Sequence, residues 1–455
     1  MAVVGHGGEI IHSQFPATKQ DLCHVTMLSL PPLTTPRSPG PLVPSPAVAQ
    51  ASLVVQKFGG SSVADADRMR AVADYVARTR RRGVRVVVVV SAMGKETDQL
   101  LRLAAEVSNT RPGREMDMLI TAGERKAMAL LCMALHDAGV PADSFTGSQA
   151  GLITDNEHTR AKLVEIRADR IRAALHEGRV PVVGGAQGVS LAHNVTFLGR
   201  GGSDITAVAL ATALDADACE LYTDVSGVFT ADPRVVPGAR RLHRVSFEEM
   251  LEMCASGCPK PEMRSVEFAR NHHVKLHVRS SFTWEPGTWI EEEDPQVEQP
   301  IISAVTSDAS EAKLTVTGVP DRPGVAARLF RALADRMVNV DMIEQNISIQ
   351  GTTDISFTVP RPDLEVALEV CRALQLEIGA TGVLGDDEIA TVSLIGAGMK
   401  THPGVSATMF ETLANEGINI EMISTSAIRI TCVVRRALAE QAVIVLHDAF
   451  KLEAE

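Results

Sequence analysis

Val54-Val55-Gln56-Lys57-Phe58-Gly59-Gly60-Ser61-Ser62 is the stretch that decides the fold of this chain. An apolar run leads into a lysine, two glycines and two hydroxyl side chains, and helix-forming sequence follows over 64–81. A strand that ends in Gly-Gly and opens a helix presents free backbone N–H groups and the positive end of a helix dipole. Because Lys57 can reach an anion there as a point charge, the stretch predicts a phosphate site.

Strand and helix patterns alternate from residue 53 to about residue 290. Several strand-like runs are almost entirely apolar, so both faces of the sheet should be buried. This pattern predicts an α/β fold in which a mostly parallel sheet lies between helix layers, with ligands at the carboxyl ends of the strands. The expected strands are 53–58, 84–91, 143–146, 180–184, 218–223 and 274–278, and 114–138 is among the expected helices.

The composition limits the classes of protein. A net charge of −12 argues against a nucleic-acid surface, and the longest apolar run, around 86–90, is too short to cross a membrane. The seven cysteines are scattered, which suits a reducing cytoplasm. Cys254 and Cys258 have no second pair to complete a zinc site, so ordinary thiols are the better interpretation.

Residues 1–50 differ from the rest of the chain. The stretch 31–46 holds seven prolines in sixteen residues, and such sequence cannot build a core. We interpret 1–50 as a disordered extension, or as translation assigned too far upstream.

A repeat follows an acidic linker that begins at Glu291. Strand and helix patterns over 310–386 predict one βαββαβ unit, with a last strand at 378–384, and the pattern restarts near 388. Pro323-Gly324-Val325 matches Pro403-Gly404-Val405, and Asn339 corresponds to Asn419. The second copy lacks one strand, which 301–307 can supply. We therefore expect a first domain over 52–293, one small domain over 301–307 plus 388–455, and another over 310–386 inserted in it.

Four further segments contain residue types that could bind a ligand, and each also has a purely structural interpretation. Ser91 ends a valine-rich strand, where a simple turn is equally possible. Glu124 places a carboxylate inside a helix, where a solvated face is the alternative. The glycine-rich turn 198–204 contains Arg200, which can grip a carboxylate, or it is only a turn with Asp204 as a cap. The segment 223–234 follows a strand, where a nucleotide could rest, or is a loop.

The chain lacks a Ser/His/Asp triad, a cluster of metal ligands and a His-Arg-Asp kinase loop. Phosphoryl transfer to an alcohol usually needs a base, whereas an acceptor carboxylate, with a pKa of about 4, is already ionised at pH 7. Transfer to a carboxylate needs only positioning and charge neutralisation. Lys57, the glycine-turn amides and Mg²⁺ carried by ATP could supply both.

From about residue 52 to its end, the chain resembles aspartate kinases. The motifs Lys57–Val63, 114–125, 199–204 and 222–234 occur in the order of that family. The resemblance implies an amino-acid-kinase fold followed by two ACT domains, the first inserted in the second. It also implies phosphorylation of the L-aspartate side-chain carboxylate with MgATP, the first step towards lysine, threonine and methionine.

The resemblance also implies roles for individual residues. Lys57 stabilises the transferring phosphate, and Asp204 orients Lys57 or the substrate. Arg200 holds the α-carboxylate of aspartate, and Glu124 either contacts its ammonium or forms part of its surroundings. Further implied aspartate contacts are Ser91 and Ser203, and the implied nucleotide contacts are Phe58, Gly59, Gly60, Ser61, Thr223, Asp224, Phe229, Thr230, Ala231, Asp232, Pro233 and Arg234. The Mg²⁺ ligands stay unassigned.

The chain departs from the family pattern at two places. Ala186 stands where the family usually has phenylalanine, which removes an aromatic wall. Pro259 stands where relatives carry a lysine assigned to ATP, and Lys260 follows it. Either Lys260 substitutes along a changed loop path, or nucleotide affinity is reduced. These departures keep three alternatives open: a kinase for another carboxylate, a paralogue for a secondary pathway, and an effector-binding pseudokinase.

Regulation and assembly also follow from the resemblance. It implies threonine or lysine as effectors at the interface of the ACT domains, a homodimer formed through these domains, and a cytoplasmic enzyme. Ser426-Ala427 replaces the Ser-Glu pair of the family, so a carboxylate that could meet an effector ammonium is missing. The implied effector contacts are Asp321, Gly324, Ala326, Asn339, Val340, Asp341, Gln345, Asn419, Ile420 and Ser426.

Overall fold

The computed structural model describes residues 52–293, 300–346 and 351–453. The expected extension over 1–50 lies outside these residues. In the described part, eight strands form one sheet in the order β10-β12-β11-β9-β1-β2-β6-β3. All of its pairs are parallel except that of β11 with β12. The strands are β1 (Leu53–Phe58), β2 (Arg85–Val90), β3 (Ala142–Phe145), β6 (Val180–Gly184), β9 (Ala218–Thr223), β10 (Arg244–Ser246), β11 (Leu276–Ser280) and β12 (Thr288–Glu291).

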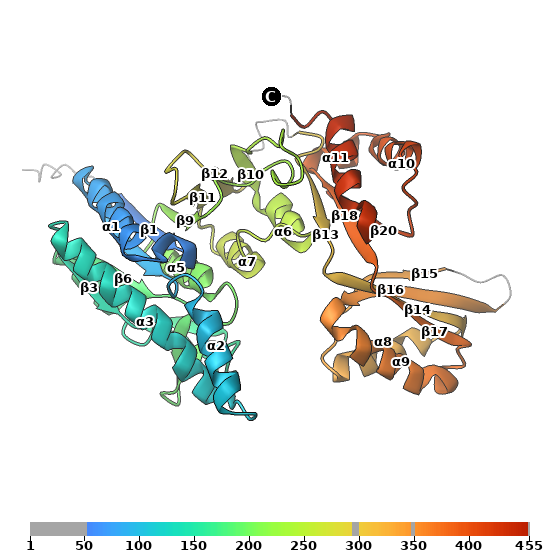
Figure 1. Ribbon diagram of the computed structural model, residues 1–455, viewed down its shortest axis with the longest axis horizontal. Helices are drawn as coiled ribbons and strands as arrows, with labels where there is room; N and C mark the ends of the chain where they lie inside the picture. The colour runs from blue at the N-terminus through green and yellow to red at the C-terminus, as the bar shows by residue number, and fades with distance from the viewer. Residues whose placement is uncertain (1–51, 294–299, 347–350, 454–455) are drawn as a thin grey trace, which may run out of the picture. The chain divides into compact units, whose positions relative to one another are not determined.

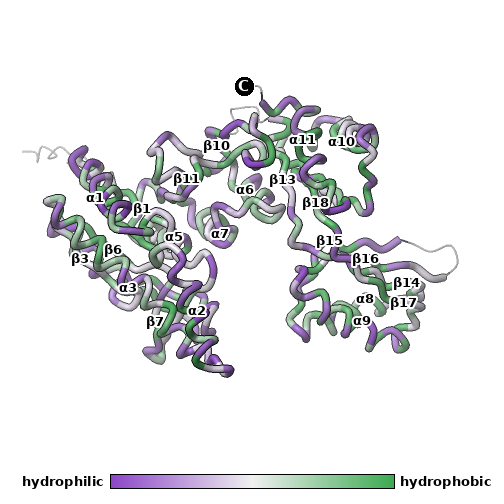
Figure 2. Tube along the Cα trace, in the orientation of Figure 1, coloured by the Kyte–Doolittle hydropathy of each residue, from purple (hydrophilic) through white to green (hydrophobic). Residues whose placement is uncertain are grey.

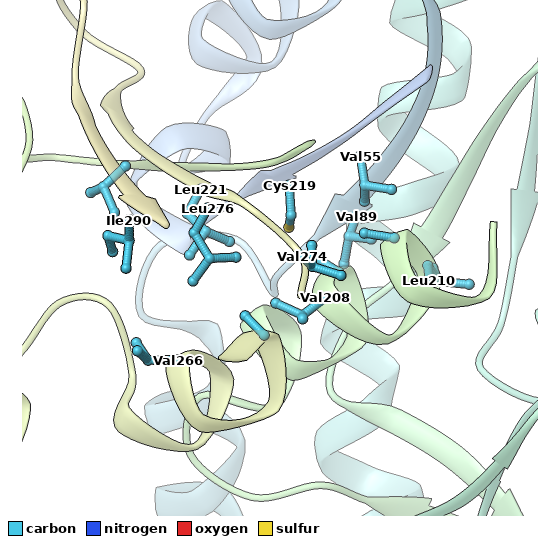
Figure 3. Packing of buried hydrophobic residues seen from close by; sticks show 14 of the residues in the cluster. Val55, Val89, Val208, Leu210, Cys219, Leu221, Val266, Val274, Leu276 and Ile290 are labelled. Carbon is cyan, nitrogen blue, oxygen red and sulfur yellow. The ribbon is translucent and has the colours of Figure 1, made fainter. Parts of the chain in front are cut away.

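Helices cover both faces of this sheet. Val87 and Val89 of β2 pack into one hydrophobic cluster, and Val86, Val88 and Val90 pack into the cluster on the other face. Figure 3 shows the first cluster, in which residues of β1, β9 and β11 meet side chains of α5 and α7. The helices are α1 (Ala66–Arg81), α3 (Gly113–Asp137), α4 (Asp169–His176), α5 (Gly202–Ala213), α6 (Phe247–Ala255) and α7 (Met263–Asn271). This arrangement confirms the predicted α/β sandwich.

Several elements were not anticipated from the sequence. A second sheet, in the order β5-β4-β7-β8, consists of β4 (Leu152–Thr154), β5 (Leu163–Ile166), β7 (Gln187–Ser190) and β8 (Val195–Phe197). Helix α2 (Glu96–Val107) contains no buried residue. Strands of three or four residues are too short for a hydrophobic period to be recognised.

Two small antiparallel sheets follow. The first has the order β15-β16-β14-β17, and the second has the order β13-β18-β20-β19. Figure 1 shows helices α8 and α9 along the first sheet and α10 and α11 along the second. The elements are β13 (Ala304–Asp308), β14 (Glu311–Pro320), α8 (Val325–Asp335), β15 (Asp341–Gln345), β16 (Thr352–Pro360), α9 (Leu364–Ile378), β17 (Gly382–Asp386), β18 (Ile389–Ile395), α10 (Val405–Asn415), β19 (Met422–Thr425), β20 (Arg429–Arg435) and α11 (Ala439–Ala449).

Strand β13 pairs antiparallel with β18, with Ala304 opposite Ile395. The segment near 301–307 therefore supplies a strand to the second small sheet, although the strand itself spans 304–308. This pairing supports the nested arrangement, which we keep as a proposal for the domain boundaries.

The start of one predicted strand was wrong. The expected strand over 378–384 begins only at Gly382, because α9 extends to Ile378. Gly379 ends this helix with a φ of 77°, a left-handed conformation that favours glycine.

Helices α1 and α3 are amphipathic, with most of their buried residues hydrophobic and most of their charged residues exposed. In Figure 2, α1 and α3 carry hydrophilic and hydrophobic residues along their length. Within the described ranges, no helix is both long and apolar enough to cross a membrane.

Candidate active site

Lys57 and Asp204 form the centre of the site. Lys57 lies at the end of β1 and Asp204 lies in the first turn of α5. The Lys57 Nζ is 2.6 Å from Asp204 Oδ1, and both side chains are less than a tenth exposed. Removing a charged pair from water is costly unless the partners meet closely. The sequence placed these residues 147 positions apart, and the fold brings them together.

Backbone turns surround this pair. A Cβ on Gly60 would lie 2.8 Å from the carbonyl oxygen of Ala92, so only glycine lets the two turns approach. The Gly94 N–H donates to the carbonyl of Gly60 at 3.0 Å, which fixes their separation. Gly201, with a φ of 70°, begins α5 and leaves the amide-rich end of the helix facing the same region.

A cavity of about 600 Å³ brings most of the predicted site residues together. Its lining includes Lys57, Gly59, Gly60, Ser61, Ser91, Glu124, Arg200, Ser203, Asp204, Thr223, Asp224 and Lys260. Phe58 does not line this cavity, because its ring is fully buried and stacks on Tyr222 with centroids 4.7 Å apart. The side chain of Phe58 is a core residue rather than a ligand contact.

Glu124 is buried, so the interpretation as a solvated helix face was wrong. Its side chain is 3% exposed within the 600 Å³ cavity, and its Oε2 has no hydrogen-bond partner among the described residues. Burial raises the pKa of this carboxyl to about 7, although backbone hydrogen bonds at Glu124 and Ala92 oppose the shift. An unpaired buried carboxylate beside a cavity is suited to bind a cationic group.

The segment 223–234 lines a second cavity of about 420 Å³. Its wall also contains Pro259 and Lys260, and Lys260 lines both cavities. Of the predicted nucleotide contacts, Asp224, Phe229, Ala231, Asp232, Pro233 and Arg234 line this second cavity. Thr230 does not line either cavity: it is fully buried, and its hydroxyl bonds to His447.

The segment that carries Lys260 lies between two helices. Helix α6 ends at Ala255 and α7 begins at Met263, and Pro259 and Pro261 between them disfavour a continuous helix. The Cys254 thiol donates to the carbonyl of Pro261 at 3.2 Å, and the Cys258 thiol donates to that of Lys260 at 3.3 Å. Burial raises the pKa of both thiols, which agrees with ordinary, unreactive cysteines.

Asp117 is a residue that the sequence reasoning missed. It is fully buried on α3, and its carboxylate accepts the Thr159 backbone N–H at 2.8 Å and lies 2.6 Å from His158 Nδ1. Thr159 lines the 600 Å³ cavity, so Asp117 fixes one wall of it. Asp117 and Glu124 are seven residues apart in the sequence, so they lie on the same face of α3. This spacing is the feature of the sequence that could have identified Asp117.

The predicted effector residues occupy equivalent places in the two small domains. Gly324 and Gly404 begin α8 and α10 with φ values of 97° and 105°, which explains the shared Pro-Gly-Val sequence. Asp341 and Gln345 begin and end the edge strand β15, with Asn339 and Val340 just before it. Asn419 and Ile420 precede the matching edge strand β19.

Ser426 contacts the first domain as well as its own small domain, where its hydroxyl accepts the backbone N–H of Ile428 at 3.3 Å. Its hydroxyl donates to Glu252 Oε1 of α6 at 3.3 Å, and Arg429 lies 3.1 Å from the same carboxylate. Ala427 beside it is exposed. The Ser-Ala pair is therefore close to the helix that precedes the Lys260 segment.

The architecture is that of a small-molecule kinase joined to a pair of regulatory domains. The chain matches the model of the amino acid kinase family over residues 52–280, and that of the ACT domain over 314–374 and 392–450. An aspartokinase of Mycolicibacterium smegmatis is 56% identical over 406 residues, which cover 88% of this chain and 96% of that protein. The chain belongs to the aspartokinase family, and the prediction of an aspartate kinase with ACT domains is confirmed.

Two solved structures of an aspartokinase are similar to this chain in fold. Aspartokinase III of E. coli in complex with aspartate and ADP, in the R-state, is 26% identical with a TM-score of 0.76, over 88% of this chain and 99% of that one. The same enzyme in complex with lysine and aspartate, in the T-state, is 27% identical with a TM-score of 0.70, with the same shares covered.

Proposed function

We propose that this enzyme transfers the γ-phosphoryl group of MgATP to the side-chain carboxylate of L-aspartate. A carboxylate oxygen of aspartate attacks the γ-phosphorus, the bond to the β,γ-bridging oxygen breaks, and ADP leaves with that electron pair. The carboxylate carries no proton at neutral pH, so no base is needed. The observation that carries this proposal is the Lys57–Asp204 pair at the amide-rich end of α5, in a cavity that shares Lys260 with the 420 Å³ cavity.

In this proposal, Lys57 neutralises charge on the transferring phosphoryl group, and Asp204 holds its ammonium in place. The donors in the two cavities fit a triphosphate, because lysines and helix-terminal amides are the usual partners of phosphate. Nucleotide then occupies the 420 Å³ cavity. Mg²⁺ bound to ATP supplies further charge neutralisation.

The acceptor amino acid occupies the 600 Å³ cavity. Arg200 binds its α-carboxylate, Glu124 meets its ammonium, and Ser91 and Ser203 donate hydrogen bonds. This assignment uses one cation and one buried anion for the two charged groups that every α-amino acid shares. The enzyme is a cytoplasmic homo-oligomer formed through its ACT domains, as the resemblance implies.

Replacing Lys260 by alanine is expected to raise KM for MgATP about tenfold, since a charge-assisted contact to phosphate is worth roughly 1.5–3 kcal/mol. KM for aspartate should stay within twofold. Steady-state kinetics on both substrates measure this, with Lys260→Arg as the conservative variant and exposed Lys162→Ala as the control. An unchanged KM for MgATP in Lys260→Ala would mean that Lys260 does not replace the missing lysine.

Feedback by lysine is expected to be weak, and Ala427→Glu should strengthen it, because it places a carboxylate where an effector ammonium could bind. Ala427 is exposed, so the longer side chain displaces no core residue. Inhibition curves with lysine, threonine and both together measure this, and Ala427→Gln controls for side-chain size. Tight concerted inhibition of the native enzyme would contradict the expectation.

A further inference from the structure

The loop that lines the nucleotide cavity is packed into a regulatory domain. Ala231 and Val236 are each 4% exposed, and they belong to the same hydrophobic cluster as Val305 of β13 and Leu446 of α11. Figure 1 places α11 beside the segment that joins β9 to β10. The 420 Å³ cavity is itself lined in part by residues of β13 and by Val443 of α11. The wall of the 420 Å³ cavity therefore consists of residues from both the kinase domain and the second small domain.

Thr230 is the residue through which the loop is hydrogen-bonded to both β13 and α11. Its carbonyl accepts the Val305 N–H at 2.8 Å, and its Oγ1 lies 2.9 Å from His447 Nε2 of α11. The same Oγ1 accepts the backbone N–H of Arg240 at 3.0 Å. Both Thr230 and His447 are fully buried, so a broken contact could not be replaced by solvent without a rearrangement.

The burial of His447 favours a neutral imidazole in this contact. Burial lowers the pKa of His447, which disfavours the charged ring. Thr230 Oγ1 already accepts the Arg240 N–H, so its single proton can be donated to Nε2. One hydroxyl therefore joins a ring nitrogen on α11 to a backbone amide at the far end of the loop.

We infer that His447 is a positioning residue for nucleotide binding, acting through Thr230. Phe229 and Ala231, the two neighbours of Thr230, line the nucleotide cavity. Any displacement of Thr230 must move both neighbours, because they are joined to it by peptide bonds. The inference rests on the proposed function, since it assumes that the 420 Å³ cavity takes the nucleotide.

The test is calorimetric binding of MgADP to the full chain, together with separate titration of aspartate. His447→Leu should raise Kd for MgADP at least fivefold and leave that for aspartate within twofold. His447→Gln, which can place an amide oxygen near the Nε2 position, should bind within twofold of the native chain. Exposed Glu440→Ala on the same helix is the control.

A folded His447→Leu chain with native affinity for MgADP would overturn the inference, as would equal losses for MgADP and aspartate. If His447→Leu does not fold, Thr230→Val and Thr230→Ser decide the matter: the valine variant should lose affinity for MgADP and the serine variant should keep it. Equal affinities of these two variants would also overturn the inference. A native chain that binds no MgADP would reject the proposed function itself, which separates the two failures.

Discussion

Replacing Lys57 by methionine is expected to lower kcat by about 10²–10³, the usual cost of removing one group that stabilises transition-state charge. The same change should lower stability by about 3–5 kcal/mol, because it leaves the Asp204 carboxylate buried without its partner. Methionine is close to lysine in length and fills most of the same volume. Steady-state kinetics and denaturant unfolding measure the two effects.

The double variant Lys57→Met/Asp204→Asn separates catalysis from stability. It removes both charges, so most of the lost stability should return, whereas kcat should stay as low as in the single variant. A double variant that recovers kcat would show that Lys57 serves only to neutralise Asp204. Such a result would move the phosphate-stabilising role to another group in the cavity.

Replacing Glu124 by glutamine is expected to raise KM for aspartate about tenfold to a hundredfold at pH 8, because the ammonium of the substrate loses its anionic partner. In the native enzyme, affinity for aspartate should rise with pH through about 7, where the Glu124 carboxyl ionises. The pH profile of kcat/KM for aspartate measures this. The glutamine variant should lack the titration near pH 7, and a retained titration would assign it to another group.

Glu124 also has an expected effect on stability. Its folded pKa, about 7, lies above the ordinary value of 4.5, so the folded chain binds the proton more tightly than the unfolded chain. Glu124 therefore makes its full contribution to the free energy of unfolding below pH 4.5, and this contribution is lost as the pH rises through 7. The glutamine variant should therefore have a higher Tm than the native chain at pH 8 and an equal Tm at pH 4. A Tm difference that is independent of pH would contradict the assignment.

Much of the fold could be predicted because the strands of the large sheet carry strong local signals. The valine run of β2 indicates a strand buried on both faces. The Gly-Gly pair after Phe58 indicates the end of the neighbouring strand β1. The short strands β4, β5, β7 and β8 have too few residues for a period to emerge. The strand expected over 378–384 was placed too early because the end of α9 is defined by the left-handed Gly379, whose conformation depends on its neighbours.

The site was predictable where one segment carries the chemistry, as in the Lys57 strand-turn and the turn around Arg200. Contacts that depend on tertiary structure were not predictable. Phe58 and Thr230 lie inside recognisable segments, yet their side chains point into the core. His447 is separated from Thr230 by 217 residues, and a lone histidine in an amphipathic helix gives no sign of its partner. The burial of Glu124, which sets its pKa, likewise depends on packing against distant elements.

The most direct test of the proposed function is the release of ADP from MgATP with L-aspartate as acceptor, combined with trapping of the acyl phosphate by hydroxylamine. The proposed function predicts ADP release that depends on aspartate, with one hydroxamate formed for each ADP, and much lower rates with glutamate. ADP release that does not respond to aspartate, or that yields no hydroxamate, would contradict it. Nucleotide and effector binding without any turnover would instead identify a regulatory pseudokinase.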